Sequence, residues 1–255
     1  MIRTMIALCL FVIVGVGLAA AEELTIAAAS DLNFVFREIV TEYEKVSGDQ
    51  VRLTLGSSGN FFAQIQNGAP FDLYFSADIS YPKKLEEAGL AVSGSLYPYA
   101  IGRIVLWAGN ESHFDLSKGL EVLREPTVKK IAIANPKHAP YGRAAVAAME
   151  HEQVYDRIKD KLVLGENISQ AAQFVESGAA DVGIIALSLA LASPMQAVGH
   201  YWEIPADAHP RIEQGAVILL GGKNQEGAKA FLSFIQGAQG QAMMKRYGFL
   251  APSPR

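Results

Sequence analysis

The stretch that decides the fold runs from residue 24 to residue 45 and reads LTIAAASDLNFVFREIVTEYEK. Its first six residues form a short apolar run, which is typical of a buried β-strand. From Asp31 to Lys45 the apolar side chains recur every three or four residues, which predicts an amphipathic helix. Ser30 and Asp31 stand where the strand pattern gives way to the helical one. The stretch is therefore one strand–helix unit with polar residues at its junction.

The same unit follows twice more along the chain. A strand pattern at 51–55 precedes a helical pattern at 60–66, and a strand pattern at 72–75 precedes a helical pattern at 81–88 that Gly89 closes. Strands that alternate with helices usually pair in parallel. The three units together predict one parallel α/β block.

A second block lies between two long β-like runs. We interpret these runs, residues 99–108 and 211–220, as crossings between two lobes. Strand and helical patterns alternate again between them, at 130–134, from 141, at 162–164, at 169–176 and at 182–187. The last helical pattern, about 225–246, is expected to pack on the first lobe. The prediction is an α/β fold of two lobes around a hinged cleft. Each lobe is expected to be a mainly parallel sheet flanked by helices, with residues 22–100 plus 215–255 in lobe I and 101–214 in lobe II.

The N-terminus has the layout of a secretory signal peptide. Arg3 gives a positive start, residues 5–18 are an almost unbroken apolar run, and residues 19–21 (AAA) offer a small-residue cleavage site. We predict that residues 1–21 are removed on export. The alternative is a membrane anchor, but the run is short for a bilayer span.

The composition excludes several classes of protein. With 50% apolar and 19% charged residues, the 255-residue chain is too apolar for a disordered protein and long enough for two lobes. A net charge of −4, or −5 without Arg3, provides no basic surface for nucleic acid. Cys9 is the one cysteine and lies in the segment expected to be removed, which excludes disulfides and thiolate metal clusters. The five histidines show no metal-binding spacing: His113, His138, His151, His200 and His209.

Neutral hydrogen-bond donors stand at four junctions where helices are expected to begin: residues 30–31, 56–59, 135–142 and 167–169. Ligands of parallel α/β sheets bind beyond the carboxyl ends of the strands. Helix N-termini there carry unpaired N–H groups and a partial positive charge. Each of these polar residues could also be an ordinary helix N-cap. Together, and with no Lys or Arg in the first position facing the cleft, they indicate an anion-binding cleft.

Four motifs follow one another through the whole mature chain: residues 27–30 (AAAS), 56–59 (GSSG), 67–78 (NGAPFDLYFSAD) and 245–249 (KRYGF). In this order they closely resemble the periplasmic molybdate-binding proteins of ABC importers. The resemblance implies a two-lobe periplasmic binding protein fold of type II in the periplasm. It also implies molybdate or tungstate as the ligand, no cofactor and no catalysis.

The resemblance also implies which residues bind the anion. The family's two serine donors fall on Ser30 and Ser58, each expected to give a hydroxyl and a backbone N–H. A further donor falls on Tyr141, and the N–H donor after the following strand falls on Ile168. These groups would hold the anion by its oxygens, so no protein atom would bond the metal.

One position departs from the family pattern. Many members have a tyrosine where this chain has Ala186, and the hydroxyl of that tyrosine reaches the anion. Tyr141 stands where many members have a small residue. We therefore hypothesise that the Tyr141 hydroxyl replaces the missing donor from the other side of the cleft.

Asp31 does not suit a site for a dianion, because a carboxylate would repel the ligand. We expect its side chain to turn outward against the helix N-terminus, where its charge suits the helix dipole, while its N–H can still face the ligand. An inward orientation would make phosphate a credible ligand, since a carboxylate can accept the remaining proton of phosphate.

The expected protein is a monomer that closes on molybdate or tungstate and delivers it to a membrane ABC permease with its ATPase. A binding protein for sulfate or phosphate is the alternative within the same class. An exported serine hydrolase is a second alternative, but it needs a general base beside Ser30 or Ser58, and no motif supplies one. A scaffold or receptor domain without transport is the third.

Overall fold

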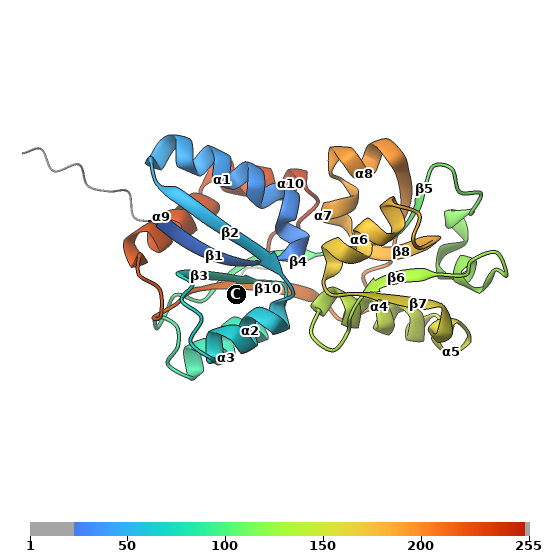
Figure 1. Ribbon diagram of the computed structural model, residues 1–255, viewed down its shortest axis with the longest axis horizontal. Helices are drawn as coiled ribbons and strands as arrows, with labels where there is room; N and C mark the ends of the chain where they lie inside the picture. Colours follow the sequence, from blue (N-terminus) through green and yellow to red (C-terminus); the bar gives the residue numbers. More distant parts are fainter. Residues whose placement is uncertain (1–22, 253–255) are drawn as a thin grey trace, which may run out of the picture.

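The computed structural model describes residues 23–252, so the predicted signal peptide lies outside the described residues. Figure 1 shows two lobes side by side, each built on its own sheet. Within residues 23–252 no helix combines the length and the apolar character that a membrane span requires.

The sheet of lobe I has the strand order β2-β1-β3-β10-β4. Its strands are β1 (Glu23–Ala29), β2 (Gln50–Gly56), β3 (Leu73–Ser76), β4 (Tyr97–Gly102) and β10 (Ile212–Ile218). The first three pair in parallel, as the repeated strand–helix units predict, whereas β10 runs antiparallel to both β3 and β4. One face is covered by α1 (Asn33–Ser47), α9 (Gln225–Gln236) and α10 (Ala238–Arg246), and the other by α2 (Ser58–Gln66) and α3 (Ser80–Glu87) (Figure 1).

The apolar spacing of the first strand–helix unit explains how α1 packs. Its buried side chains Val35, Phe36, Ile39 and Tyr43 recur every three or four residues, so they form one stripe that faces the sheet. Phe36 meets Phe75 of β3 edge-to-face with ring centroids 4.8 Å apart, a preferred geometry for aromatic pairs. A short 3-10 turn, η1 (Ser30–Leu32), separates β1 from α1 and is wholly buried.

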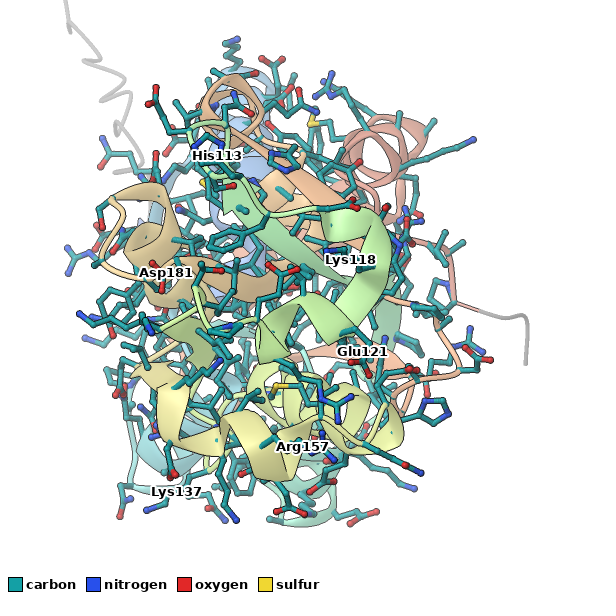
Figure 2. The ribbon with its side chains drawn as sticks, turned by 90° about the vertical axis from the view of Figure 1, so that its right-hand side faces the viewer. His113, Lys118, Glu121, Lys137, Arg157 and Asp181 are labelled. Atoms are coloured by element: carbon teal, nitrogen blue, oxygen red, sulfur yellow. The ribbon has the colours of Figure 1, made fainter. Side chains whose placement is uncertain are left out.

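The sheet of lobe II has the order β7-β6-β8-β5-β9. Its strands are β5 (Ile104–Gly109), β6 (Ile131–Ala134), β7 (Leu162–Gly165), β8 (Val182–Ala186) and β9 (Gly199–Glu203). The helices are η2 (Leu116–Arg124), α4 (Pro140–His151), α5 (Tyr155–Ile158), η3 (Lys159–Lys161), α6 (Ile168–Glu176), α7 (Leu187–Ala190) and α8 (Ser193–Val198). Figure 2 views the molecule from this end, where charged side chains such as Lys118 and Arg157 face outward.

The crossings between the lobes differ in detail from the predicted ones. The run 99–108 is two strands rather than one, because β4 ends at Gly102 in the first sheet and β5 starts at Ile104 in the second. The predicted boundaries after residues 100 and 214 fall inside β4 and inside β10. We therefore propose Arg103 and the segment 204–211 as the two crossings.

The observed fold differs from the predicted one in three further details. Each sheet contains one strand that runs antiparallel to both of its neighbours, namely β10 between β3 and β4 in one sheet and β5 between β8 and β9 in the other. The strand β9 had no counterpart in the sequence pattern, and four of its five residues carry polar or aromatic side chains. The last helix is broken at Gly237 into α9 and α10.

Asp72 holds three segments of lobe I together from a buried position. Its Oδ2 accepts from the backbone N and from the Oγ1 of Thr25, both at 2.7 Å, and its Oδ1 accepts from the backbone N of Asn224 at 2.7 Å. The carboxylate therefore joins β1, β3 and the start of α9.

We expect Asp72→Ala to lower the free energy of unfolding by about 3–5 kcal/mol, because it leaves three donors without their acceptor. Denaturant unfolding followed by circular dichroism measures the change. Asp156→Ala is the matched control, since Asp156 is exposed on α5 and pairs with Lys159 only, and we expect a change within about 0.5 kcal/mol. Equal losses for both variants would contradict the structural role of Asp72.

Candidate functional site

A small cavity lies where the helix-starting junctions of the two lobes meet. Its empty volume is about 180 Å³, and it is lined by Ala29, Ser30, Asp31, Gly56, Ser57, Ser58, Ala77, Ala139, Pro140, Tyr141 and Ile168. All five residues named from the sequence as ligand-binding are among them. The structure thus brings together η1 and α2 of lobe I with α4 and α6 of lobe II.

The hydroxyls of Ser30 and Ser58 are oriented so that they can donate into this cavity. Ser58 Oγ accepts from the backbone N of Ala77 at 2.9 Å, and Ser30 Oγ accepts from the backbone N of Ser169 at 3.3 Å. Both side chains are buried, and within residues 23–252 no acceptor takes either hydroxyl proton. Each serine therefore keeps one donor for a ligand.

Three helices begin at the cavity and add backbone donors. Helix α2 starts at Ser58, α6 starts at Ile168, and α4 starts at Pro140, which makes the N–H of Tyr141 the first N–H of α4. The first N–H groups of a helix have no partner within the helix and lie at the positive end of its dipole. No Lys or Arg lines the cavity. The arrangement can bind an anion through neutral donors alone.

The prediction that Asp31 turns outward was wrong, and its inward orientation keeps phosphate among the ligands to be tested. Its side chain is 1% exposed, and its Oδ2 accepts from the Tyr141 hydroxyl at 2.9 Å and from Gln214 Nε2 at 2.8 Å. Burial raises the pKa of this carboxyl to about 6, although the hydrogen bonds from Gln214 and Tyr141 lower it. The charge is held by partners that are distant in the sequence, which is why the N-cap interpretation failed.

The hypothesis that the Tyr141 hydroxyl replaces the donor missing at Ala186 is also contradicted. That hydroxyl gives its proton to Asp31 and accepts from Gln214 Nε2 at 2.9 Å, so it has no proton left for an anion. Its oxygen sits against Gly102, where an added Cβ would lie 2.1 Å away. Tyr141 therefore joins the lobes through its ring and hydroxyl, and only its N–H remains a candidate donor.

The polar network around Asp31 contains residues that sequence reasoning missed. Tyr99 of β4 donates to Gln214 Oε1 at 2.6 Å, which fixes the amide so that its NH₂ group faces Asp31. Ser188 of α7 donates its hydroxyl to the backbone O of Asp31 at 2.7 Å. The strand β10 reads IEQGAVI, and the polar Gln214 in this run was the sequence signal that could have indicated the network.

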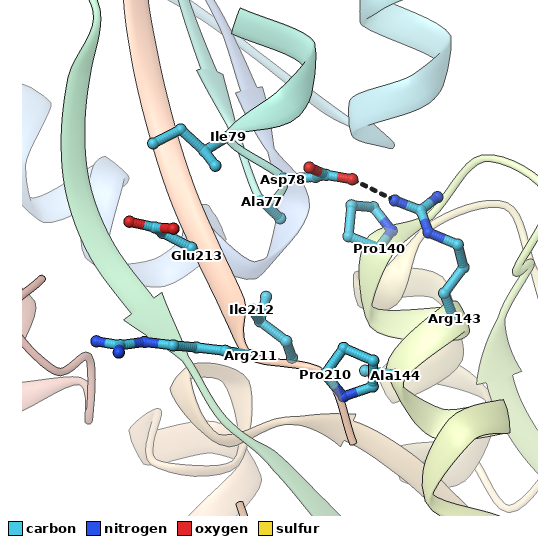
Figure 3. A pocket seen from close by; sticks show the side chains of 10 residues that line it. All are labelled: Ala77, Asp78, Ile79, Pro140, Arg143, Ala144, Pro210, Arg211, Ile212 and Glu213. Carbon is cyan, nitrogen blue, oxygen red and sulfur yellow. Dashed lines mark hydrogen bonds and ion pairs between the residues drawn. The ribbon is translucent and has the colours of Figure 1, made fainter. Parts of the chain in front are cut away.

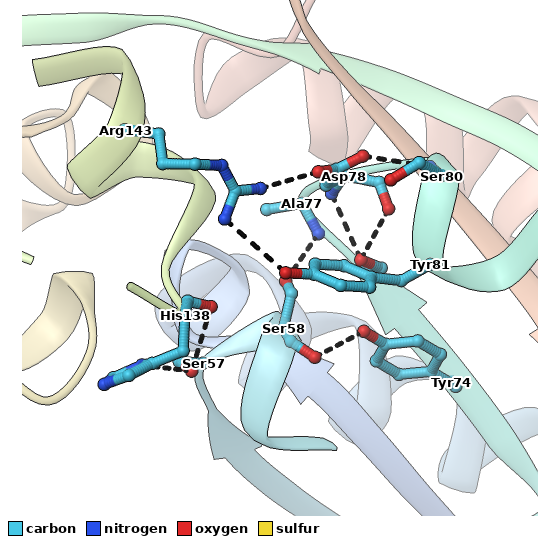
Figure 4. A network of polar contacts seen from close by, with 10 residues as sticks. Ser57, Ser58, Tyr74, Ala77, Asp78, Ser80, Tyr81, His138 and Arg143 are labelled. Carbon is cyan, nitrogen blue, oxygen red and sulfur yellow. Dashed lines mark hydrogen bonds and ion pairs between the residues drawn. The ribbon is translucent and has the colours of Figure 1, made fainter. Parts of the chain in front are cut away.

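Contacts on both rims of the cavity hold the lobes together. On one rim Arg143 of α4 pairs with Asp78 at 2.6 Å and lies near the Tyr81 hydroxyl (Figure 4). On the other rim the ring of His138 meets Ser57 Oγ at 2.8 Å, and its backbone O accepts from the N–H of Gly59 at 2.9 Å. His138 therefore contacts lobe I across the cleft. Its position close to Tyr141 in the sequence allowed this placement, although a surface loop was the favoured expectation.

A larger hollow lies beside the cavity, beyond Ala77 and Pro140, with an empty volume of about 710 Å³ (Figure 3). Two carboxylates and two guanidinium groups line it, those of Asp78, Glu213, Arg143 and Arg211, and Arg143 is paired with Asp78. The small cavity is the better candidate, because the donors at three helix starts line it. Within residues 23–252 no cluster of His, Cys, Asp and Glu has the makeup of a metal-ion site.

Comparisons with known proteins show which family the chain belongs to. The family profile described as bacterial extracellular solute-binding protein matches residues 24–250. The molybdate-binding protein ModA of Azotobacter vinelandii is 38% identical over 94% of this chain and 96% of its own length. ModA of Rhodobacter capsulatus is 38% identical over 96% of this chain and 95% of its own.

Solved structures show the same relationship. The periplasmic molybdate-binding protein of Azotobacter vinelandii superposes with a TM-score of 0.85 and 33% identity, covering 90% of this chain and all of that one. The sulfate-binding protein SubI of Mycobacterium tuberculosis has a TM-score of 0.71 at 15% identity over 91% of this chain and 88% of its own, which shows a shared fold only. The predicted α/β fold of two lobes is thereby confirmed, and the chain belongs to the bacterial extracellular solute-binding protein family.

Proposed function

We propose that this chain is an exported binding protein that captures molybdate or tungstate between its lobes and delivers it to a membrane ABC permease and its ATPase. The observation that carries the proposal is the buried cavity of neutral donors at the meeting point of three helix N-termini. The ModA relatives, which share more than a third of their residues with this chain, support the choice of ligand.

The proposed ligand contacts are the hydroxyls of Ser30 and Ser58 and the backbone N–H groups of Ser30, Asp31, Ser58, Tyr141 and Ile168. They would hold the oxygens of the anion, with no protein atom bonded to the metal. Hydrogen bonds to a charged partner each contribute roughly 1.5–3 kcal/mol net, so several of them suffice for tight binding in a cavity without water. Size would give selectivity, because these fixed donors cannot all reach a smaller tetrahedral anion.

The surroundings of the protein belong to the same proposal. We propose cleavage after Ala21, a periplasmic location, a monomer, and no catalytic step or cofactor. After this cleavage the net charge is −5, so we expect no long-range attraction of the anion and no binding of nucleic acid. The serine hydrolase alternative needs a general base beside Ser30 or Ser58, whereas His138 lies beside Ser57. The Ser57 hydroxyl accepts from the N–H of Asn60 at the start of α2, which is a helix-capping role.

Calorimetric titration of the mature, dialysed protein with molybdate, tungstate, sulfate and phosphate at neutral pH tests the function. We expect tight one-to-one binding of molybdate and tungstate and at least about a hundredfold weaker binding of the other two. Tight binding of sulfate or phosphate alone would keep the fold and overturn the ligand. Absence of binding to all four anions would overturn the assignment of the cavity.

A further inference from the structure

The buried carboxylate of Asp31 has one satisfied oxygen and one without a partner. Oδ2 accepts from Tyr141 and Gln214, whereas Oδ1 is buried and has no hydrogen-bond partner. Buried carboxylate oxygens normally find donors, because an unpartnered one costs free energy. The same residue lines the proposed anion cavity. A negative charge is therefore held, incompletely compensated, beside the place where a second negative charge would enter.

The groups that face this carboxylate are all neutral. They are Tyr141 of α4, Gln214 of β10, Tyr99 of β4 behind Gln214, and Ser188 of α7, which bonds the Asp31 backbone. Burial, together with the nearby Asp31 charge, raises the pKa of Tyr99 and of Tyr141 well above the ordinary range, so both phenols keep their protons. No Lys, Arg or His contacts the carboxylate within residues 23–252. Nothing in the protein can therefore neutralise an added dianion next to Asp31 except a proton.

On this basis, and resting on the proposed function, we propose that the cavity binds a proton together with the oxyanion and that Asp31 is the proton's site. Like charges interact strongly in a cavity without water, so a bound dianion favours the neutral carboxyl group. Oδ1 receives the proton, because Oδ2 already accepts two hydrogen bonds. Asp31 thereby becomes a determinant of affinity, although its side chain is not one of the proposed donors to the anion.

The direction of the pH dependence follows from linkage. Without ligand the pKa of Asp31 is about 6, so the carboxyl is mostly ionised above that pH. Bound dianion raises this pKa further, and binding must then take up a proton. Affinity is expected to fall as pH rises above about 6, by up to about tenfold per pH unit, until the pH exceeds the pKa of the complex.

The test is calorimetric titration of the wild-type protein with molybdate in two non-oxyanion buffers of different ionisation enthalpy. At about pH 7.5 we expect an uptake between about 0.5 and about 1 proton per anion, and a dissociation constant that rises between about pH 6.5 and about pH 8.5. Asp31→Asn keeps the shape of the side chain and removes its charge. In this variant the proton uptake and the pH dependence should both vanish, and the affinity at about pH 8.5 should exceed that of the wild type.

Two control variants identify the group that takes the proton. Asp78→Asn removes a carboxylate that is paired with Arg143 at one rim, and His138→Asn removes the imidazole at the other rim. Both should retain the proton uptake. Uptake that is lost in His138→Asn and kept in Asp31→Asn would overturn the proposal, as would molybdate binding without any uptake in the wild type. Failure of molybdate to bind at every pH would instead overturn the proposed function.

Discussion

Replacing Ser30 and Ser58 together with alanine is expected to weaken molybdate binding between about a hundredfold and about ten-thousandfold. Each hydroxyl would give the anion one charge-assisted hydrogen bond worth roughly 1.5–3 kcal/mol, and the two serines lie on different elements that do not share a partner. Calorimetric titration of the two single variants and of the double variant measures the loss and shows whether the two contributions add.

The same substitutions also remove the acceptors of the Ala77 and Ser169 N–H groups, so some loss of stability is expected. Thermal unfolding separates that loss from the loss of affinity. Ser177→Ala serves as the matched control, because Ser177 follows the far end of α6 and its hydroxyl bonds only within its own helix. If the double variant bound molybdate as tightly as this control, the serines would not be ligands.

Gly142→Ala is expected to damage both the stability of lobe II and its half of the site. An added Cβ at this position would lie 2.1 Å from the backbone O and 2.8 Å from the carbonyl carbon of Ala134. Backbone atoms at the end of β6 cannot rotate away as a flexible side chain can, so the first turn of α4 must shift. That turn carries both the N–H of Tyr141 and the hydroxyl that bonds Asp31.

We expect Gly142→Ala to cost about 2–4 kcal/mol of stability and to weaken anion binding by at least about tenfold. Denaturant unfolding and calorimetry measure the two effects. Gly109→Ala at the end of β5 is the control, since its nearest contact to an added Cβ is 3.7 Å away, at an ordinary van der Waals distance. A Gly142→Ala variant that is as stable as this control and binds the anion as tightly would show that α4 can shift without loss of stability or affinity.

The local pattern of apolar residues was sufficient to predict most of the fold. Apolar runs followed by helical spacing identified β1, β2, β3 and the helices after them, because each depends on neighbouring residues only. The break between β4 and β5 could not be seen in this way. It marks the point where the chain passes from one sheet to the other, and the Tyr141 hydroxyl of lobe II lies against Gly102 there.

The site also has a part that could be predicted from the sequence and a part that could not. The four junctions were predictable as a set because ligands of parallel α/β sheets bind where helices begin beyond the strand ends, and the family resemblance then picked out Ser30, Ser58, Tyr141 and Ile168. The orientation of Asp31 was not, because its partners Tyr141 and Gln214 lie 110 and 183 residues further along the chain. A charged residue before a helix is usually a cap, and only the tertiary structure shows that this one is buried.

The contacts at the two rims affect how long a bound anion stays in the cavity. The Arg143–Asp78 pair on one rim and the His138 contacts on the other join the lobes beside the cavity. An anion that binds donors of both lobes adds to these contacts, so its residence time depends on how often the lobes separate against both sets of bonds. Any partner that pulled these rims apart would therefore decide the moment of release.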